Sequence, residues 1–367
     1  MAIIGLTETW RGEARTGLQV KQPEPGQGVR PTRVLLLSDG RPGHYRQSEG
    51  VVAALRRRGP VELDRREVRP RWPVSKALIP KLGRLLPPKM VLGLLHGIDP
   101  AHLERPDLIV SAGGPTIGAN VALARLWDTP NVFSGSTRGY PLTAFHLVLT
   151  PYVSVAAPPK VVFAPKPSPF DPDRIPASRP LRSPDDLRGG RVSVLIGGPT
   201  SYADFAREDW ERLAALVATL VAEWQTKVTV VTSPRTPEAA YEHILPLVER
   251  CGGAVSVVDF RAAGPGSIDR AFDCDLVLIT SDSMSMMTEA AVSRRAAIAL
   301  APHKVAPNRD DQAVAGLVGA GWLAVLPLAA ADAAAIVETA AALMPMQENH
   351  LDRLADLIAS AISEPGR

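Results

Sequence analysis

The sequence predicts an α/β protein made of two Rossmann-like domains that face a cleft. Short, fully apolar runs alternate with helical patterns, which is typical of a mostly parallel sheet covered by helices on both faces. The alternation stops at a proline-rich segment, residues 157–190, and then starts again. A chain of 367 residues is long enough for two domains of ordinary size. Clefts between such domains are common ligand sites.

The first domain is predicted over residues 32–156, after a polar N-terminal tail over 1–31 that has little periodicity. Its first strand, RVLLLS at 33–38, leads into a glycine-containing loop and a helix. That helix is predicted around 46–58, and a second helix follows residues 113–116 and ends at about 127. Further strands are predicted at 61–68, 107–112, 131–135 and 146–150.

Nine prolines between residues 157 and 190 predict the connection between the domains, because proline removes backbone donors and interrupts regular structure. The second domain is predicted over 191–345, and a C-terminal helix over 346–367. The second domain again alternates: strands at 191–198, 227–232, 254–259, 275–280, 296–301 and 322–326, and helices at 208–225, 237–250, from 283 and near 310–319.

Composition excludes several classes of protein. Two cysteines without a Cys/His cluster exclude a disulfide framework and a structural zinc site, so no metal is expected. The first residues lack the basic and apolar regions of a secretory signal, and a cytoplasmic protein is expected. Nucleic-acid binding is not expected, because no recognition module is present and aromatic residues make up only 5% of the chain.

Positive charge is concentrated near the N-terminus. Residues 1–90 carry 18 Lys and Arg against 8 Asp and Glu, although the net charge of the whole chain is +3. Within residues 69–97, cations alternate with Trp, Leu, Ile and Met. Such a basic amphipathic stretch can lie on an anionic membrane, here the inner face of the cytoplasmic membrane. It also suits a phosphorylated substrate. The alternative is a surface helix whose apolar stripe packs on a sheet.

Four polar loops follow predicted strands, and in doubly wound sheets ligands bind at this end of the strands. Glycine lets backbone N–H groups approach an anion, and a helix N-terminus adds a positive dipole end, so a diphosphate suits these loops. None of them matches the Walker pattern or GxGxxG with a following acidic residue, which argues against ATP hydrolysis of that type and a nicotinamide cofactor. The loops are 38–44 with Gln47 in the next helix, 113–116, 196–201 and 281–289.

The last of these loops is the most informative. Ser281, Asp282, Ser283 and Ser285 surround a predicted helix start, where their oxygens can cap free N–H groups. Glu289 comes four residues after the last serine and therefore lies on the same helix face. A carboxylate there can accept two hydrogen bonds from the vicinal hydroxyls of a ribose. The alternative is an exposed glutamate that the helix dipole favours.

Another polar loop and helix start follow the next predicted strand. Asp311 and Gln312 suit the hydroxyls of a sugar. His303, Lys304 and Arg309 suit phosphate groups. A solvated loop and a capped helix are the alternative.

The second half of the chain resembles the donor-binding domain of GT-B glycosyltransferases, especially the enzyme that adds N-acetylglucosamine to the lipid-linked peptidoglycan precursor. This resemblance lies in the GGPT loop at 197–200, the Ser-rich helix start with Glu289, and residues 302–312. The whole chain is more similar still to the bacterial "mitochondrial fission" family. The motifs that carry this similarity are SDGRPGH at 38–44 with Gln47, IGGP at 196–199, TSPRTP at 232–237 and TSDSMSMMTEA at 280–290.

The resemblance implies a GT-B-like fold and a metal-independent glycosyltransferase. Its co-substrate would be a nucleotide sugar, with no other cofactor, and its acceptor a lipid-linked molecule or a glycan. The candidate donor contacts are Gly197, Gly198, Pro199, Thr200, Ser201, Arg235, Ser281, Asp282, Ser283, Ser285, Glu289, Lys304, Asp311 and Gln312. The candidate acceptor contacts are Gly40, Arg41, Gly43, Gln47, Gly113, Gly114 and Thr116.

Transfer to a hydroxyl requires a base in the first domain. His44 lies in the appropriate loop, and imidazole ordinarily titrates near neutral pH, where general-base catalysis is efficient. Asp39 is the second candidate. Two other functions are left open by the sequence: an epimerase or hydrolase of the same fold that needs no acceptor, and a non-catalytic, membrane-associated scaffold that binds no nucleotide.

Overall fold

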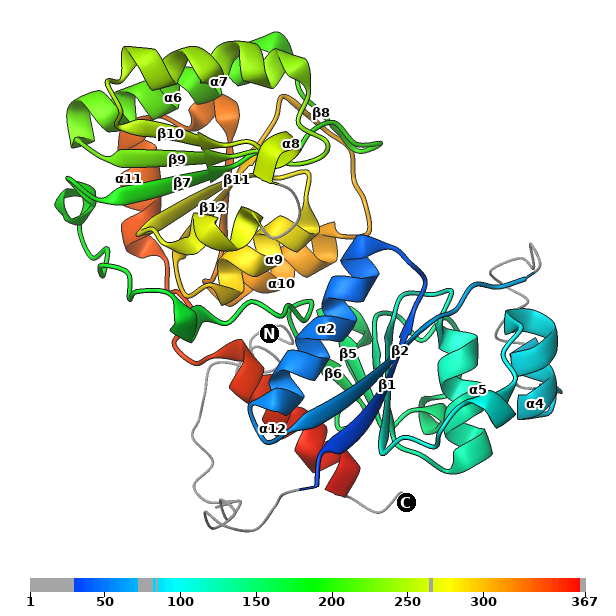
Figure 1. Cartoon of the computed structure of the whole chain (residues 1–367). Coiled ribbons are helices and arrows are strands. Elements are labelled where there is room, and N and C mark those ends of the chain that lie inside the picture. The colour runs from blue at the N-terminus through cyan, green and yellow to red at the C-terminus, as the bar shows by residue number, and fades with distance from the viewer. Residues whose placement is uncertain (1–29, 72–81, 84, 264–266, 364–367) are drawn as a thin grey trace. The chain divides into compact units, whose positions relative to one another are not determined.

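The computed structural model describes residues 30–71, 82–83, 85–263 and 267–363. They belong to two compact units: the described parts of 30–169 together with 350–363, and residues 170–349. Each unit contains a six-stranded sheet, and helices lie on both faces of each sheet (Figure 1). All pairings within the two six-stranded sheets are parallel. Two Rossmann-like α/β units are therefore present, as the alternation of apolar runs and helices predicted.

The first unit has the strand order β2-β1-β3-β4-β5-β6. Its elements are β1 (Thr32–Ser38), α2 (Pro42–Arg56), β2 (Val61–Glu67), α4 (Pro88–Met90), a π-helical turn (Val91–His96), β3 (Leu108–Ala112), α5 (Ile117–Trp127), β4 (Asn131–Ser134), β5 (Leu147–Thr150), β6 (Val161–Phe163) and α12 (His350–Ser363). Leu35 and Leu37 of β1 pack with Ile109 of β3 and Leu123 of α5 in one core cluster. Helices α2 and α12 lie on the other side of the sheet (Figure 1).

Strand β6 lies inside the segment that the proline content assigned to the connection. It pairs with β5 through Val148 and Val161, and its residues Val161 and Phe163 are buried. Prolines flank this short apolar run without interrupting it, and an edge strand tolerates the loss of the backbone donors beside it. The connection between the two compact units is placed at residues 169 and 170, rather than before the run.

The C-terminal helix belongs to the first unit. Arg57, directly after α2, makes two hydrogen bonds to the carboxylate of Asp352 in α12, at 2.8 and 2.7 Å. At the start of α12, the buried Nε2 of His350 lies 3.1 Å from the backbone oxygen of Ser168. These contacts hold α12 against the first unit. The sequence pattern did not predict which domain the last helix packs on.

The second unit has the strand order β10-β9-β7-β11-β12-β14. A short antiparallel pair, β8 with β13, lies outside the main sheet. The elements are β7 (Arg191–Leu195), β8 (Ala203–Asp204), α6 (Arg207–Trp224), β9 (Lys227–Val231), α7 (Glu238–Arg250), β10 (Val255–Val258), α8 (Phe260–Ala263), β11 (Leu276–Thr280), α9 (Met284–Val292), β12 (Ala296–Ala301), β13 (Lys304–Val305), α10 (Asp311–Gly319), β14 (Ala324–Pro327) and α11 (Ala333–Ala342).

The core of the second unit joins one face of the sheet to three helices. Leu278 of β11 and Ile298 of β12 belong to the same buried cluster as Trp210 of α6, Ile244 of α7 and Ile336 of α11. Helices α9 and α10 lie on the opposite face (Figure 1). In α6 and α7 the apolar face of an amphipathic helix therefore packs on the sheet, whereas nearly all of α9 is buried.

Each sheet has one switch point, from which successive strands are added first toward one edge and then toward the other. In the first sheet this point lies between β1 and β3, and in the second it lies between β7 and β11. In doubly wound sheets, ligands bind beyond the carboxyl ends of the strands at such a switch point. The loops after these four strands are those that the sequence selected.

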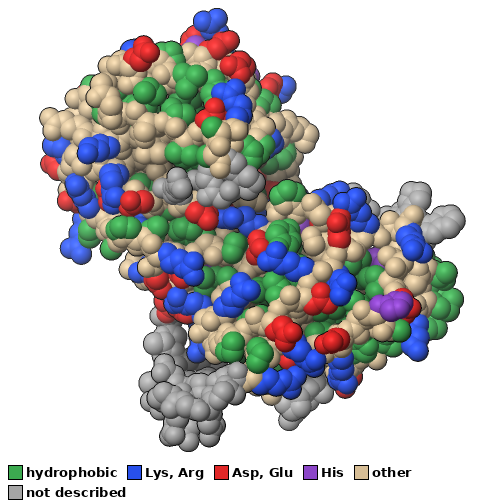
Figure 2. Space-filling view, in the orientation of Figure 1, with side chains coloured by type: hydrophobic (Ala, Val, Ile, Leu, Met, Phe, Trp, Pro, Cys, Tyr) green, Lys and Arg blue, Asp and Glu red, His purple; other side chains and the backbone are tan. Residues whose placement is uncertain are grey.

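Parts of the predicted N-terminal features lie outside the described residues. These parts are residues 1–29 of the predicted tail, and residues 72–81 and 84 of the basic stretch at 69–97. In the described part of that stretch, Leu85, Met90 and Leu94 are exposed apolar side chains. On the face shown in Figure 2, Lys and Arg side chains are spread among Asp and Glu side chains on both units. Over the residues that the structure describes, we find no helix with both the length and the hydrophobicity needed to span a membrane.

Candidate functional site

The loop after β1 brings an aspartate and a histidine into contact. The Asp39 carboxylate is buried, and its Oδ2 lies 2.8 Å from Nδ1 of the partly exposed His44. Its Oδ1 accepts a hydrogen bond of 3.2 Å from the backbone N–H of Arg41. A carboxylate only accepts hydrogen bonds, so Nδ1 of His44 carries a proton and the neutral ring keeps its lone pair on Nε2. The two candidate catalytic residues thus form an oriented pair in which His44 can accept a proton.

Gly113, in the loop after β3, makes room for this pair. Its φ is +83°, and a Cβ atom there would lie 2.1 Å from Nδ1 of His44. Because β1 and β3 are neighbouring strands, this contact lies at the switch point of the first sheet. Gly40, at φ +78°, permits the turn between β1 and the start of α2. Both glycines therefore shape the site through their backbone.

Two further residues at this edge of the sheet were missed in the sequence. Ser134, at the end of β4, donates a hydrogen bond of 2.9 Å to Oε1 of Gln47, whose Nε2 donates to the backbone oxygen of Gly43. The guanidinium of Arg138 lies against Gly114, where a Cβ atom would come within 2.3 Å of its Nε. The only signal available in the sequence was the polar loop after this strand.

Thr116 does not present its hydroxyl to a ligand. The side chain is fully buried, and its Oγ1 lies 3.1 Å from the backbone oxygen of Ala112 and 3.0 Å from that of Gly113. The hydroxyl therefore closes the turn before α5. It does not contact an acceptor, which is the role that the sequence suggested. Arg41, in the neighbouring loop, has a side chain that is largely exposed.

In the second unit, the glycine loop after β7 is already bonded within the protein. The N–H of Gly197 donates to Oγ1 of Thr280 at 2.7 Å, and the N–H of Gly198 donates to Oδ2 of Asp282 at 3.1 Å. The N–H of Thr200 donates to a carbonyl of β8 at 2.9 Å. These three amides do not form the open cradle for a diphosphate that the glycines suggested. Side chains at and just beyond the end of β11 occupy the position that an anion would take.

The tip of the same loop is more accessible. Pro199 and Ser201 are exposed. The hydroxyl oxygen of Thr200 accepts hydrogen bonds from the backbone N–H groups of Tyr202 and Ala203, at 3.3 and 3.0 Å. Of the loop's two hydroxyl groups, that of Ser201 is therefore the one on an exposed residue.

Asp282 connects the glycine loop to a cation. Its carboxylate is fully buried, and Oδ2 lies 2.7 Å from Nη2 of Arg235, whose Nη1 also bonds the backbone oxygen of Gly198 at 3.3 Å. A Cβ atom on Gly197 would come within 2.1 Å of the same Oδ2. Burial raises the pKa of Tyr202, whose hydroxyl donates to the backbone oxygen of Asp282 at 2.7 Å. Asp282 thus aligns the half-exposed Arg235 and does not itself reach a ligand, contrary to the sequence prediction.

Helix α9 begins at Met284, two residues after Asp282. The hydroxyl of Ser283, the residue before its first turn, makes no capping hydrogen bond among the described residues. Ser281 is bonded through its backbone N–H to the oxygen of Leu300, and Ser285 is exposed. The sequence allowed these serines to cap the helix. At the observed helix start, the Ser283 side chain does not cap the free N–H groups. The positive end of the helix dipole therefore favours an anion at this position.

Glu289 lies in the second turn of α9, four residues after the exposed Ser285. Its side chain is buried, with 5% of its surface exposed, and Met286, Met287 and Ala290 around it in the sequence are buried as well. Carboxylates are rarely placed at such positions, because removing them from water is unfavourable. A ribose could reach only a small part of this carboxylate.

The loop after β12 is also organised by contacts within the protein. Both oxygens of Asp311 bond Asn308, one to its backbone N–H at 2.8 Å and one to its side-chain amide at 2.7 Å. Asp311 therefore supports the loop, where the sequence suggested a contact with the sugar. Lys304 is exposed in β13, opposite Asp204 of β8, and Gln312 is exposed at the start of α10.

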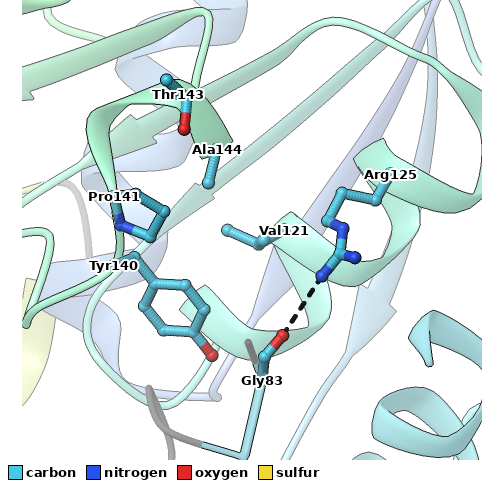
Figure 3. Close-up of a pocket in the computed structure, with 7 residues that line it drawn as sticks. All are labelled: Gly83, Val121, Arg125, Tyr140, Pro141, Thr143 and Ala144. Carbon is cyan, nitrogen blue, oxygen red and sulfur yellow. Dashed lines mark hydrogen bonds between the residues drawn. The ribbon is translucent and has the colours of Figure 1, made fainter. Parts of the chain in front are cut away.

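A cavity of about 390 Å³ lies in the first unit, beside α5 (Figure 3). Burial raises the pKa of Tyr140 in its wall to about 12, and Arg125 bonds the backbone oxygen of Gly83 at 3.4 Å. The lining residues are Gly83, Val121, Arg125, Tyr140, Pro141, Thr143 and Ala144. None of them is a predicted site residue, so the cavity is separate from the switch-point loops. Within the described ranges, no group of three or more His, Cys, Asp or Glu side chains is arranged to hold a metal ion.

A family model described as mitochondrial fission ELM1 matches residues 42–362. The chain belongs to this family. The matched residues include the loops after β3, β7, β9 and β11 and the last part of the loop after β1. A search of curated protein sequences finds no match.

Solved structures with a similar fold have low sequence identity to the ELM1-family chain. The glycotransferase of kitacinnamycin is 13% identical, with 91% of this chain and 100% of that chain covered and a TM-score of 0.49. MurG from Acinetobacter baumannii is 13% identical, with 90% and 100% covered and a TM-score of 0.47. UDP-GlcNAc 2-epimerase from Neisseria meningitidis, bound to UDP-GlcNAc, is 11% identical, with 89% and 98% covered and a TM-score of 0.47.

Proposed function

We propose that this ELM1-family protein is a metal-independent, GT-B-type glycosyltransferase that moves a sugar from a nucleotide sugar to an acceptor hydroxyl. The second unit binds the donor and the first unit binds the acceptor. The observation that carries the proposal is the alignment of Arg235 by the fully buried Asp282 at the switch point of the second sheet. A half-exposed guanidinium beside an uncapped helix start is well suited to a diphosphate.

The donor is held mainly by side chains and by the start of α9. Arg235 pairs with the diphosphate while its other bonds, to Asp282 and Gly198, keep it in place. Lys304 adds a second cation, and Glu289 accepts hydrogen bonds from the ribose. Gln312 contacts the sugar. This arrangement replaces the main-chain cradle suggested by the glycines, because the amides of Gly197 and Gly198 are bonded within the protein.

The acceptor is activated in the first unit. Nε2 of His44 takes the proton of the acceptor hydroxyl as its oxygen forms a bond to the anomeric carbon of the sugar. The bond between that carbon and the diphosphate breaks, and its electron pair leaves with the diphosphate. Asp39 keeps the imidazole in the required tautomer and stabilises the cation that forms. Arg41 and Arg138 provide positive charge for a phosphate-bearing acceptor.

A lipid-linked acceptor agrees with the surface of the first unit. Leu85, Met90 and Leu94 are exposed in the described part of the basic stretch, with Lys89 beside them in the sequence. Apolar side chains among cations bind anionic lipid surfaces. The protein would then act in the cytoplasm, at the inner face of the membrane. Sedimentation with vesicles containing anionic lipid tests this. A variant in which all three apolar residues are changed to Ser should sediment with the vesicles less than the native protein does.

The experiment that tests the proposed activity uses a panel of nucleotide sugars, with and without membrane lipids and glycans as acceptors, and detects products by mass spectrometry. We expect a glycosylated acceptor and a free nucleoside diphosphate, and little product from His44→Asn although that variant binds the donor. A modified or hydrolysed sugar formed without acceptor would instead indicate an epimerase or hydrolase. A native protein that changes no nucleotide sugar would refute the proposal.

A further inference from the structure

A second Asp–His pair lies in the second unit, in the loop after β12. Nδ1 of His303 lies 2.8 Å from Oδ2 of Asp209, and the backbone N–H of His303 lies 3.2 Å from both oxygens of the same carboxylate. Asp209 is in the first turn of α6 and is only 1% exposed. The side chain of His303 is 45% exposed. A buried carboxylate therefore fixes a histidine whose ring reaches the surface.

Asp209 is bonded on several sides, which makes the histidine's orientation specific. Besides His303, its Oδ2 accepts a hydrogen bond of 2.9 Å from the backbone N–H of Ala206, and Arg212 lies 3.9 Å from its Oδ1. The carboxylate accepts a hydrogen bond from Nδ1–H of His303, so Nε2, on the opposite edge of the ring, is the nitrogen that can contact a ligand. This is the geometry of a functional group and the residue that orients it.

Contacts between neighbouring loops place this pair beside the candidate donor site. Directly after His303, β13 pairs with β8, and Lys304 lies opposite Asp204. The backbone N–H of Ala306 donates to the oxygen of Tyr202 at 2.7 Å. Tyr202 in turn donates through its hydroxyl to the backbone of Asp282, which aligns Arg235. The loops after β7, β11 and β12 therefore form one connected cluster within the second unit.

We infer that His303 is a further contact residue for the donor diphosphate, and that Asp209 is its positioning residue. This inference rests on the proposed function. The imidazolium lies between the carboxylate and the diphosphate, and both anions stabilise its charge. Nε2–H donates a hydrogen bond to a phosphate oxygen as the bond to the sugar breaks. His303 keeps both protons, the leaving diphosphate keeps the electron pair, and the acceptor proton goes to His44.

Two substitutions of His303 separate a ligand contact from a structural bond. His303→Asn keeps an N–H group near the position of Nδ1, so it can still bond Asp209, but it has nothing at the position of Nε2. His303→Gln places its amide closer to Nε2 and loses the bond to Asp209. His102→Asn is the matched control, because His102 also lies beside an aspartate, Asp99, but is exposed in the first unit.

The measurement is calorimetric binding of UDP, GDP, ADP and CDP and of the matching monophosphates to the native protein and each variant. We expect His303→Asn to weaken binding of the preferred diphosphate about tenfold, to leave the monophosphate nearly unchanged, and to keep the native unfolding temperature. His303→Gln should keep more of the diphosphate affinity. Asp209→Asn should resemble His303→Asn, and combining them should add little.

The outcomes distinguish this inference from the proposed function. If the native protein binds a diphosphate and His303→Asn binds it equally well, the assignment of His303 is wrong while the donor site stands. Equal losses for diphosphate and monophosphate would show that His303 only supports the loop, and would also overturn the inference. If the native protein binds none of the four diphosphates, the proposed function itself is refuted.

Discussion

Arg235 and Asp282 form an ion pair in which a half-exposed guanidinium lies 2.7 Å from a fully buried carboxylate. The oxygen that contacts Arg235 also accepts the N–H of Gly198, while the other oxygen, Oδ1, is buried without a hydrogen-bond partner among the described residues. The charge of Asp282 is therefore balanced chiefly by Arg235. Arg235 therefore stabilises the buried carboxylate to which the loop after β7 is bonded.

The first prediction concerns this ion pair. Arg235→Ala should lower the free energy of unfolding by about 2 kcal/mol, because a buried charge loses its partner. This is less than the ~3–5 kcal/mol typical of fully buried pairs, since Arg235 is partly exposed. Arg235→Ala combined with Asp282→Asn should regain part of the loss, because the buried charge is then removed too. Urea unfolding of the three proteins checks this, and a double variant less stable than Arg235→Ala would contradict it.

The second prediction compares two glycines of the first unit. Gly113 and Gly139 have nearly the same backbone angle φ, at +83° and +84°. A Cβ atom on Gly113 would come within 2.1 Å of His44, whereas nothing lies within 4 Å of a Cβ on Gly139. Gly139→Ala should lose about 1 kcal/mol of stability from backbone strain alone. Gly113→Ala should lose more and should also displace His44 from Asp39.

Turnover of the two alanine variants distinguishes these effects. Gly139→Ala should keep the native rate, and Gly113→Ala should lose most of it while donor binding by the second unit is unchanged. Equal stability and equal activity of the two variants would show that the ring of His44 is not held against Gly113.

The third prediction concerns His96, a buried histidine whose ring nitrogens both lack hydrogen-bond partners among the described residues. Burial lowers its pKa from the ordinary 6.5 to about 4. Between these two pH values the unfolded chain binds the proton and the folded protein does not. Acidification through this range should therefore destabilise the fold, by about 3 kcal/mol in total, and stability should be recovered above pH 6.5.

His96→Leu tests this assignment. Its free energy of unfolding should depend much less on pH between 4 and 6.5 than that of the native protein, because leucine cannot be protonated. His102→Leu, which changes an exposed histidine of the same unit, should keep the native dependence. A native-like pH profile in His96→Leu would place the source of acid sensitivity elsewhere.

The sequence predicted the sheets well because their strands carry strong local signals. The apolar run at 33–38 lies within β1, and the run at 191–198 contains β7, which ends three residues earlier than predicted. Parallel strands buried on both faces are expected to be apolar throughout. Strand β6 was missed since it has only three residues and lies among prolines. The place of α12 against α2 depends on contacts such as Arg57 with Asp352, which no local pattern contains.

Site residues were predicted by loop, but not by role. Asp282 lies in a serine-rich loop and has the chemistry of a ligand contact. In the fold, however, its carboxylate is buried against Gly197 and forms an ion pair with Arg235. Asp209 carried no signal at all, because its partner His303 is 94 residues away in the sequence. The burial of a side chain, and its contacts with residues far away in the sequence, are properties of the tertiary structure. Residue type and spacing alone could therefore not reveal them.

The central claim is that the second unit binds a nucleoside diphosphate with Glu289 on its ribose, and the affinity of Glu289→Ala tests it most directly. Calorimetry should detect binding of one of UDP, GDP, ADP or CDP to the native protein. Glu289→Ala should bind the same nucleotide at least about tenfold more weakly, because the exposed part of the carboxylate no longer accepts a hydrogen bond from the ribose. Glu289→Gln, which keeps the shape, should fall between them. Native-like affinity in a folded Glu289→Ala protein would contradict the account.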